Sequence, residues 1–363
     1  MQPGRLTALR CRSQLLSGPP ARTPVEVARQ LLAVQAQDPR GFRLAVRSRT
    51  SEGNVADLER SLTDDRSLVV STLNRGTLHL VRADDYWWLH ALTTPPLHTA
   101  NARRLAQTGV SADQAERGVG IVTAALTADG PLTREQLRSR LESAGVPTAG
   151  QALVHVLLEA TLRGLIVRGP IAGGQQAWVL VRDWLGRPPP FDRQRALAEL
   201  ARRYLAGHAP ATDRDLAKWS GLPVRDARAG LRSIADQLHD LGGGLHSLRG
   251  GQIQSRGDRA QPITNPAPRL LGPFDPMLLG WEDRRPIVGD NPTLVTSNGL
   301  FRPFALVGGR AVATWGLAGG TLTVRPFSPL STTTTRALAT EVAAIGHYLG
   351  FGTDLTLEIA TMS

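Results

Sequence analysis

Apolar residues recur three or four positions apart in several stretches of the first 264 residues, which is the spacing of one buried face of an α-helix. In the first such stretch, Val27, Leu31 and Val34 share this spacing. Thr23 is suited to cap the helix, and Pro24 is suited to its first position. The pattern therefore predicts an amphipathic helix that begins at Pro24.

Predicted helices are followed three times by two short runs that are typical of β-strands. The first pair of strands and its turn span residues 67–81. The second pair lies at 165–169 and 177–181, with a turn around Gly173 and Gly174, and the third pair falls within LGGGLHSL. Helices followed by such a two-stranded wing form a winged helix-turn-helix.

The helical spacing fades from about residue 265, where Gly and Pro turns separate short β-branched runs. These runs favour a small barrel or sandwich, with one helix over residues 333–349 before a last strand. The predicted fold is α+β: three tandem winged helix-turn-helix units and a small C-terminal β-barrel-like domain. The predicted domains are residues 1–110, 111–190, 191–264 and 265–363.

The charge of the chain indicates a partner. It has 42 Lys and Arg residues against 31 Asp and Glu residues, a formal net charge of +11, and Lys218 is its only lysine. Arginine can bind phosphate with two parallel hydrogen bonds and stack on bases, so the excess favours nucleic acid. A genomic codon bias explains the scarcity of lysine, but not the net excess of positive charge.

The composition argues against several other classes. No apolar run approaches the roughly 20 residues that cross a bilayer. Arg5, Arg10 and Arg12 interrupt the apolar stretch that a secretory signal requires, so we expect a cytoplasmic protein without a membrane partner. The single cysteine, Cys11, excludes an intramolecular disulfide, and the eight histidines lack metal-ligand spacing. We therefore expect no metal and no other cofactor.

An arginine stripe marks the third unit. Thr212 and Asp215 are placed to open one helix with a capping box. The next predicted helix displays Arg225, Arg228 and Arg232 on one face. Such a face could follow the phosphates of DNA or could simply be solvated.

The segment VQAQDPR combines two amides with a proline. On a continuous helix, Gln35 and Gln37 would point to nearly opposite sides. Pro39 disfavours helical geometry at Asp38, so we expect the helix to end near Ala36 or Gln37 and the chain to turn extended. Both amides could then converge on one site. Two polar residues at a fraying helix end are the simpler interpretation of these residues alone.

Four motifs in one order carry a resemblance to a known family. They are VQAQDPR, RGTLHLVRADDYWWL at 75–89, LLGPFDPMLLGWEDR at 270–284 and FRPFALVGGRAVATW at 301–315. Over essentially the whole chain the sequence resembles the winged-helix DNA glycosylases of the AlkZ and YcaQ type. The Gln-Φ-Gln signature of this family falls on Gln35, Ala36 and Gln37. This form is more similar to the AlkZ branch than to the YcaQ branch, which has an aspartate, although Φ is only alanine here.

The resemblance implies a monofunctional DNA glycosylase that excises alkylated, cationic purines of the N7-alkylguanine type from double-stranded DNA. It also implies unhooking of interstrand crosslinks left by DNA-alkylating natural products, as self-resistance of an antibiotic producer. The catalytic residues would be Gln35 and Gln37. We expect a monomer, because one chain with three winged helices could wrap a duplex by itself.

The chemistry of a carboxamide limits the mechanism. Gln35 and Gln37 take up no proton near neutral pH, so neither can be a strong general base. A cationic base leaves as a neutral molecule and needs no general acid. What remains is to orient a water, which we assign to Gln37, and to support the sugar or the neighbouring phosphate, which we assign to Gln35.

Further basic residues are candidates for DNA contact. Arg40 and Arg43 would bind phosphate beside the lesion or solvate the loop. His79 and Arg82 point to opposite faces of a predicted strand, so one of them could reach DNA while the other packs. Arg302, in a predicted hairpin, is a candidate minor-groove probe, although strand packing explains it equally well.

Carboxylates near the motifs have structural interpretations. Asp38 could activate a water, but a residue before proline is more often a turn or cap residue. Asp275 and Asp283 are expected to organise turns or to pair with Arg284 and Arg285, since phosphate would repel a carboxylate that faces DNA.

Two other function classes use winged helices. A transcriptional regulator would bind one operator and leave lesions untouched. A non-catalytic protein could recognise distorted DNA. Release of a base that depends on Gln37 would distinguish the enzyme from both.

Overall fold

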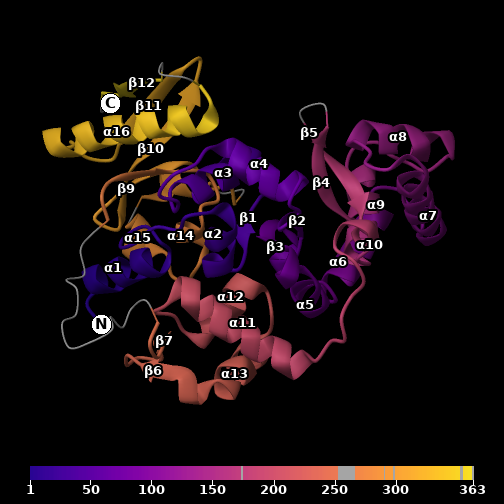
Figure 1. Cartoon of the computed structure of the whole chain (residues 1–363), viewed down its shortest axis with the longest axis horizontal. Coiled ribbons are helices and arrows are strands. Elements are labelled where there is room, and N and C mark those ends of the chain that lie inside the picture. Colours follow the sequence, from indigo (N-terminus) through magenta and orange to yellow (C-terminus); the bar gives the residue numbers. More distant parts are fainter. Residues whose placement is uncertain (173–174, 252–265, 290, 297–298, 352–354, 362–363) are drawn as a thin grey trace. The chain divides into compact units, whose positions relative to one another are not determined.

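A computed structural model describes residues 1–172, 175–251, 266–289, 291–296, 299–351 and 355–361 of the chain (Figure 1). The chain divides into two compact units. Unit 1 comprises Met1–Leu58 and Leu197–Ser363, and unit 2 comprises Glu59–Ala196. The four predicted domains stay a prediction at this coarser level of division.

The first segment of unit 1 is mainly helical. Its elements are α1 (Pro3–Ser13), α2 (Pro24–Leu31), β1 (Val34–Gln35), α3 (Pro39–Arg47) and the start of α4 (Val55–Thr63). The predicted start of α2 is confirmed, because the Thr23 side chain accepts a hydrogen bond from the Glu26 backbone N–H at 3.2 Å and Pro24 opens the helix. Val27, Ala28 and Leu31 form its buried face.

Unit 2 contains two antiparallel hairpins that join in one sheet. Its strands are β2 (Leu68–Thr72), β3 (Leu78–Arg82), β4 (Ile166–Ala172) and β5 (Gln175–Leu180), and the 3-10 turn η1 (Asn74–Gly76) joins the first two. They match the two strand pairs predicted from the sequence. Within the unit their order is β3-β2-β4-β5, because Val70 in β2 pairs with Arg168 in β4. The turn predicted around Gly173 and Gly174 lies outside the described residues.

Helices of unit 2 cover this sheet. They are α5 (Ala83–Thr93), α6 (Leu97–Gln107), α7 (Ala112–Asp129), α8 (Arg134–Ser143), α9 (Ala152–Leu162) and α10 (Val181–Trp184). Ser111 and Thr133 cap α7 and α8 in complete capping boxes. Apolar side chains of α6 to α9 pack with Ile166, Trp178 and Leu180 of the sheet and form the core of the unit.

The chain returns to unit 1 through α11 (Arg193–His208), and α12 (Asp213–Ser220) and α13 (Val224–Ser233) follow. The predicted capping box of Thr212 and Asp215 is confirmed. After the 3-10 turn η2 (Ala235–Gln237), the strands β6 (Leu238–Asp240) and β7 (His246–Leu248) pair antiparallel, where the third wing was predicted.

The C-terminal part of unit 1 is an open sheet. Its elements are β8 (Arg269–Leu271), α14 (Pro276–Leu279), α15 (Arg285–Val288), η3 (Pro292–Leu294), β9 (Phe304–Val307), β10 (Arg310–Ala318), β11 (Thr321–Pro326), α16 (Thr332–Leu349) and β12 (Thr356–Ile359). The strand order is β12-β11-β10-β9-β8, so among the described strands the two ends of the sheet do not meet. The barrel-like closure expected from the sequence is therefore not found.

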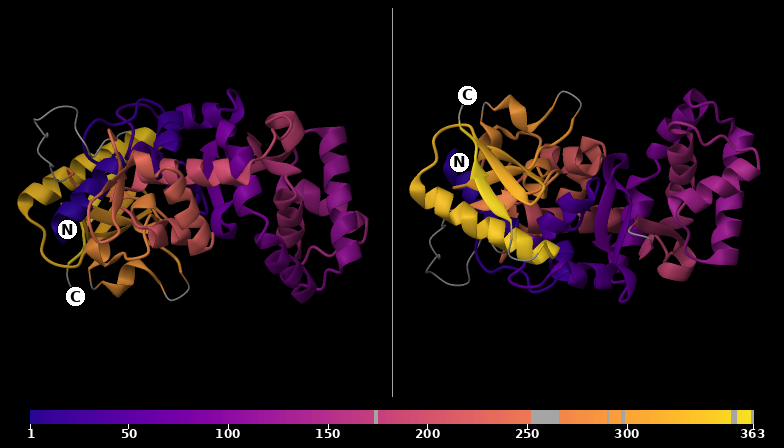
Figure 2. Two further views of the ribbon diagram at one scale, coloured as in Figure 1. Left: turned by 90° about the horizontal axis from the view of Figure 1, so that it is seen from below. Right: turned by 90° about the horizontal axis from the view of Figure 1, so that it is seen from above.

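Helix α16 explains the open form. It crosses from β11 to β12, which lie parallel, and packs on the sheet through Leu338, Val342 and Ile345 (Figure 2). A parallel pair needs such a long crossover, whereas a barrel of hairpins does not. The helix buries the face that a closed barrel would have filled with strand side chains. In the part of the chain that is described, none of the helices combines the length and apolar character that a membrane span requires.

Candidate active site

Gln35 and Gln37 lie on a short segment between α2 and α3, residues 33–38, which we call the glutamine segment. Helix α2 ends at Leu31, because Leu32 adopts φ 65° and ψ −52° and the Ala33 N–H donates to the Leu31 carbonyl at 2.8 Å. This is a γ-turn, an uncommon conformation for a bulky residue. The prediction that the helix continues to Ala36 or Gln37 is wrong, since the turn ends it five residues earlier than Ala36.

Asp38 and Pro39 begin α3 instead of ending α2. Asp38 is extended, at φ −108° and ψ 121°, and its carboxylate accepts a hydrogen bond from the Gly41 N–H at 2.6 Å. Pro39 occupies the first turn, where its missing N–H costs nothing. The predicted cap role of Asp38 is confirmed, and the carboxylate is engaged at the helix terminus.

The two amides differ in exposure. Gln35 lies in β1 and is 8% exposed, whereas Gln37 is exposed. Gln37 is therefore the amide that a substrate can reach without rearrangement, and Gln35 is placed behind it along the chain.

The first turn of α3 packs against the loop of residues 272–275, which follows β8. A Cβ atom on Gly41 would lie 2.5 Å from the carbonyl oxygen of Pro273, and a Cβ atom on Gly272 would lie 3.1 Å from the Cα of Gly41. Only glycine permits this approach. Two sequence motifs about 230 residues apart are thereby in direct contact.

The far end of α3 is held by the same loop. The guanidinium of Arg49 donates to both carboxylate oxygens of Asp275, at 2.8 and 2.9 Å, and to the Gln14 side chain at 3.0 Å. Asp275 also accepts from the Met277 N–H at 2.8 Å, and so begins α14. The expected turn role of Asp275 is confirmed, but its ion-pair partner is Arg49 and neither Arg284 nor Arg285. Asp283 does pair with Arg285, at 2.8 Å.

Cys11 lies beside this buried ion pair. Burial raises the pKa of the thiol to about 12, although the charge of Arg49 opposes the shift. The thiol is therefore protonated and unreactive at neutral pH.

Aromatic residues extend the contact to the motif at 301–315. The rings of Phe274 and Phe301 lie 5.7 Å apart, and the guanidinium of Arg284 lies 5.0 Å from the Phe301 ring. Arg302 is next in the chain and its side chain is exposed. The glutamine segment, the 272–275 loop and the Phe301 region thus form one continuous part of unit 1.

Arg40 and Arg43 lie on α3, directly after the glutamine segment. Arg40 is exposed, and Arg43 is half-buried, donates to the Pro39 carbonyl at 2.7 Å and lies 4.9 Å from the Phe42 ring. Arg40 therefore presents its charge to solvent near Gln37 in the chain. The guanidinium of Arg43, by contrast, is partly occupied by its hydrogen bond to the first turn of α3.

A model of the AlkZ-like DNA glycosylases matches residues 28–348, which include all four motifs. The chain belongs to the AlkZ-like DNA glycosylase family. The resemblance inferred from the sequence is confirmed, and the family implies DNA as the substrate.

A solved structure supports the fold of this AlkZ-like chain. The DNA glycosylase AlkZ of Streptomyces sahachiroi is similar to it with a TM-score of 0.76 and 24% sequence identity, over 98% of this chain and 99% of that chain. A search of the curated proteins gives no match.

Strand β3 of this AlkZ-like chain does not present His79 to solvent. The His79 side chain is 1% exposed, and its Nδ1 donates to the Thr77 carbonyl at 2.9 Å. Burial lowers the pKa of His79 to about 3, and the charge of Arg75 adds to this shift. His79 is thus a neutral core residue of β3, and its predicted contact with DNA is not supported by this geometry.

Arg82 occupies the end of the same strand. It pairs with Asp84 and lies 3.8 Å from Asp85, and its side chain is 17% exposed. These two carboxylates neutralise much of its charge. Of the two wing residues, Arg82 is the one nearer to solvent, as the alternation along the strand predicts.

The arginine stripe on α13 is present. Arg225, Arg228 and Arg232 are all exposed, and Arg228 also pairs with Asp213 at 2.6 Å. Arg225 and Arg232 are accordingly better placed than Arg228 to meet a phosphate.

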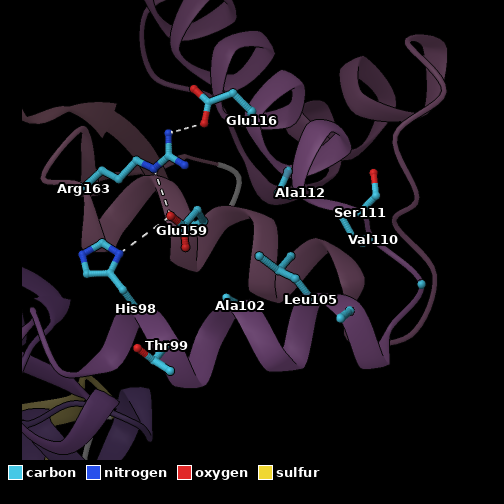
Figure 3. Close-up of a pocket in the computed structure, with 13 residues that line it drawn as sticks. His98, Thr99, Ala102, Leu105, Val110, Ser111, Ala112, Glu116, Glu159 and Arg163 are labelled. Atoms are coloured by element: carbon cyan, nitrogen blue, oxygen red, sulfur yellow. Dashed lines mark hydrogen bonds and ion pairs between the residues drawn. The ribbon is translucent and has the colours of Figure 1, made fainter.

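Unit 2 contains a cavity of about 830 Å³ that the sequence did not predict (Figure 3). Its polar wall is a network in which Glu159 accepts from Asn101 and Arg163, both at 2.9 Å, and Arg163 also donates to Glu116 at 2.6 Å. His98 lies 3.7 Å from Glu159. The signal in the sequence is the i, i+4 spacing of Glu159 and Arg163 at the end of the mainly apolar helix α9.

The charges of this cavity make it unsuited to DNA. Burial opposes ionisation of Glu159, but hydrogen bonds from Asn101 and Arg163 outweigh burial and lower its pKa. The side chains of Glu116 and Glu159 both line the cavity, and acidic side chains there would repel phosphate. Among the described residues, no group of three or more His, Cys, Asp or Glu side chains could hold a metal ion.

Proposed function

We propose that this protein is a monofunctional DNA glycosylase that hydrolyses the N-glycosidic bond of alkylated, cationic purines of the N7-alkylguanine type in double-stranded DNA. The observation that carries the proposal is the position of Gln37. Its amide is exposed on a segment fixed by the γ-turn at Leu32 and by the capped start of α3. The neighbouring carboxylate, Asp38, is committed to capping.

The chemistry follows from a neutral amide. The bond between C1′ of the deoxyribose and the ring nitrogen of the purine breaks, and its electron pair neutralises the positive charge of the base. A water oxygen forms a bond to C1′ and releases one proton to solvent. The products are a neutral modified purine and an abasic sugar, so no general acid is needed and no strand is cut.

The amide of Gln37 can act without changing its protonation state. Its carbonyl oxygen accepts a hydrogen bond from the attacking water and aims a partial negative charge at the sugar, which resembles an oxocarbenium ion at the transition state. Gln35, buried in β1, supports the sugar or the neighbouring phosphate. Arg40, exposed one turn further on, binds a phosphate beside the lesion.

The same step at a purine that is linked to the opposite strand would unhook an interstrand crosslink. The leaving group remains tethered to the other strand, and the bond that breaks is unchanged. A producer of a DNA-alkylating natural product would gain self-resistance from this activity.

A panel of lesions tests the proposed substrate class. Duplexes carry N7-methylguanine, N3-methyladenine, neutral 8-oxoguanine or unmodified guanine at one position, and the freed base is measured by mass spectrometry. We expect release from the two cationic purines only, with intact strands that break on treatment with mild alkali. Equal release of neutral 8-oxoguanine, or no release from any duplex, would contradict the proposal. A duplex crosslinked through N7 of guanine tests unhooking in the same assay.

A further inference from the structure

Two arginines converge on one face of the β4–β5 hairpin in unit 2. Arg168 in β4 is directly opposite Trp178 in β5, and its guanidinium lies 3.8 Å from the centre of the Trp178 ring. Leu132 pairs with Trp178 on the other side through two backbone hydrogen bonds, at 2.8 and 3.2 Å. Arg134 follows Leu132 by two residues as the first residue of α8.

Among the residues that the structure describes, no acidic side chain neutralises this pair. Within the described part of the chain, neither Arg168 nor Arg134 forms an ion pair or a side-chain hydrogen bond, and the Nε of Arg134 is buried without an acceptor. Burial and, to a smaller extent, the charge of Arg134 lower the pKa of Arg168 to about 10. By contrast, Arg140 on the same helix α8 pairs with Asp129 at 2.6 Å.

Two neutral donors on the hairpin also lack acceptors. The indole Nε1 of Trp178 and the amide Nε2 of Gln176 are buried without a hydrogen-bond partner among the described residues. Residues 176 and 178 alternate along β5, so they share the face of the sheet on which Arg168 lies. A buried donor without an acceptor is destabilising, so this face is more stable once an acceptor binds.

We propose that Arg134 and Arg168, together with Gln176 and Trp178, bind a phosphodiester group of the DNA backbone and give unit 2 its own contact with the duplex. Phosphate supplies what this face lacks, since it brings negative charge and several acceptor oxygens to a set made only of donors. The inference rests on DNA as the substrate in the proposed function, but not on base release. None of these four residues was a DNA-binding candidate in the sequence.

The salt dependence of DNA binding tests the assignment. Affinity for an undamaged duplex is measured by fluorescence anisotropy between about 50 and 200 mM salt, because each phosphate contact contributes about 0.9 to the slope of log K against log salt. We expect Arg134→Gln with Arg168→Gln to reduce the slope by about 1 and to weaken binding about tenfold at 100 mM salt. Arg140→Gln, on the same helix, should leave both unchanged.

Two further arms make the result decisive. Arg134→Gln alone removes a side chain that forms no ion pair or hydrogen bond with any other described side chain, so a reduced slope in this variant does not come from lost folding. The duplex in this assay is undamaged, so its outcome does not depend on base release and is separate from the proposed catalysis. An unchanged slope in both variants would overturn the proposal. Inorganic phosphate could also stabilise the wild type while the slope of log K against log salt stays unchanged in the variants. That result would assign this face to a free anion and would overturn the proposal as well.

Discussion

Arg49 and Asp275, which are 226 residues apart in the sequence, form an ion pair with two hydrogen bonds that is inaccessible to solvent. The pair ties the end of α3 to the loop that Gly41 contacts at the start of the same helix. Helix α3 is thus fixed at both ends to one loop. The glutamine segment leads directly into α3 and is therefore held in place with it.

Removal of one partner of the buried pair should strongly destabilise the folded protein. Asp275→Asn leaves the charge of Arg49 buried and unpaired, and we expect the free energy of unfolding to fall by about 3–5 kcal/mol. Urea denaturation measures this. Asp283→Asn breaks the exposed pair with Arg285 and should change stability little, so equal stability of the two variants would contradict the structural role of Asp275.

Gly41→Ala tests whether the position of α3 matters for activity. The new methyl group would lie 2.5 Å from the Pro273 carbonyl, so the helix or the loop must shift. We expect a folded protein that releases N7-methylguanine about 10- to 100-fold more slowly, because small displacements of catalytic groups greatly reduce the reaction rate. Gly120→Ala, where no atom lies within 4 Å, is the matched control and should retain activity. Full activity of Gly41→Ala would show that the rate of base release does not depend on the position of α3.

Two variants distinguish the cap role of Asp38 from a catalytic one. Asparagine can accept the hydrogen bond from the Gly41 N–H, so Asp38→Asn should keep both stability and base release. Asp38→Ala loses the cap and should unfold about 1 kcal/mol more easily. Loss of base release in Asp38→Asn, with stability unchanged, would instead identify the carboxylate as a general base.

His79 should make the protein sensitive to acid. Its pKa is about 3 in the folded state, whereas an unfolded chain binds a proton near the ordinary value of about 6.5. Between these values the unfolded state holds more protons, so stability falls as the pH decreases, by up to about 1.4 kcal/mol per pH unit from this group. His79→Asn keeps a donor for Thr77 and should weaken this dependence in urea titrations between pH 6 and 4. Parallel pH profiles of the two proteins would refute the assignment.

The local signals in the sequence predicted the elements well. Caps such as Thr23 and Thr212, and the short apolar runs of β2 to β5, depend on neighbours in the chain and therefore appear where they were expected. The extended conformation of Asp38 before Pro39 was also predictable, because it follows from a local clash.

The features that position the site were not predictable in this way. The γ-turn at Leu32 has no glycine to signal it, and the partner of Asp275 lies 226 residues away. His79 and Arg82 are both polar residues on one strand, and only the packing of unit 2 decides that His79 is buried. Tertiary contacts between distant segments set each of these features, so a single sequence contains no local trace of them.

Single-turnover release of N7-methylguanine from duplex DNA by wild-type protein and by Gln37→Ala tests the central claim most directly. Gln194→Ala, at another exposed glutamine, is the control. The account predicts rapid release by the wild type and the control, a loss of about 100-fold or more in Gln37→Ala, and duplex affinity within a factor of about two in all three. Undiminished release by Gln37→Ala would contradict the assignment of this amide, and absence of release by the wild type would contradict the proposed activity itself.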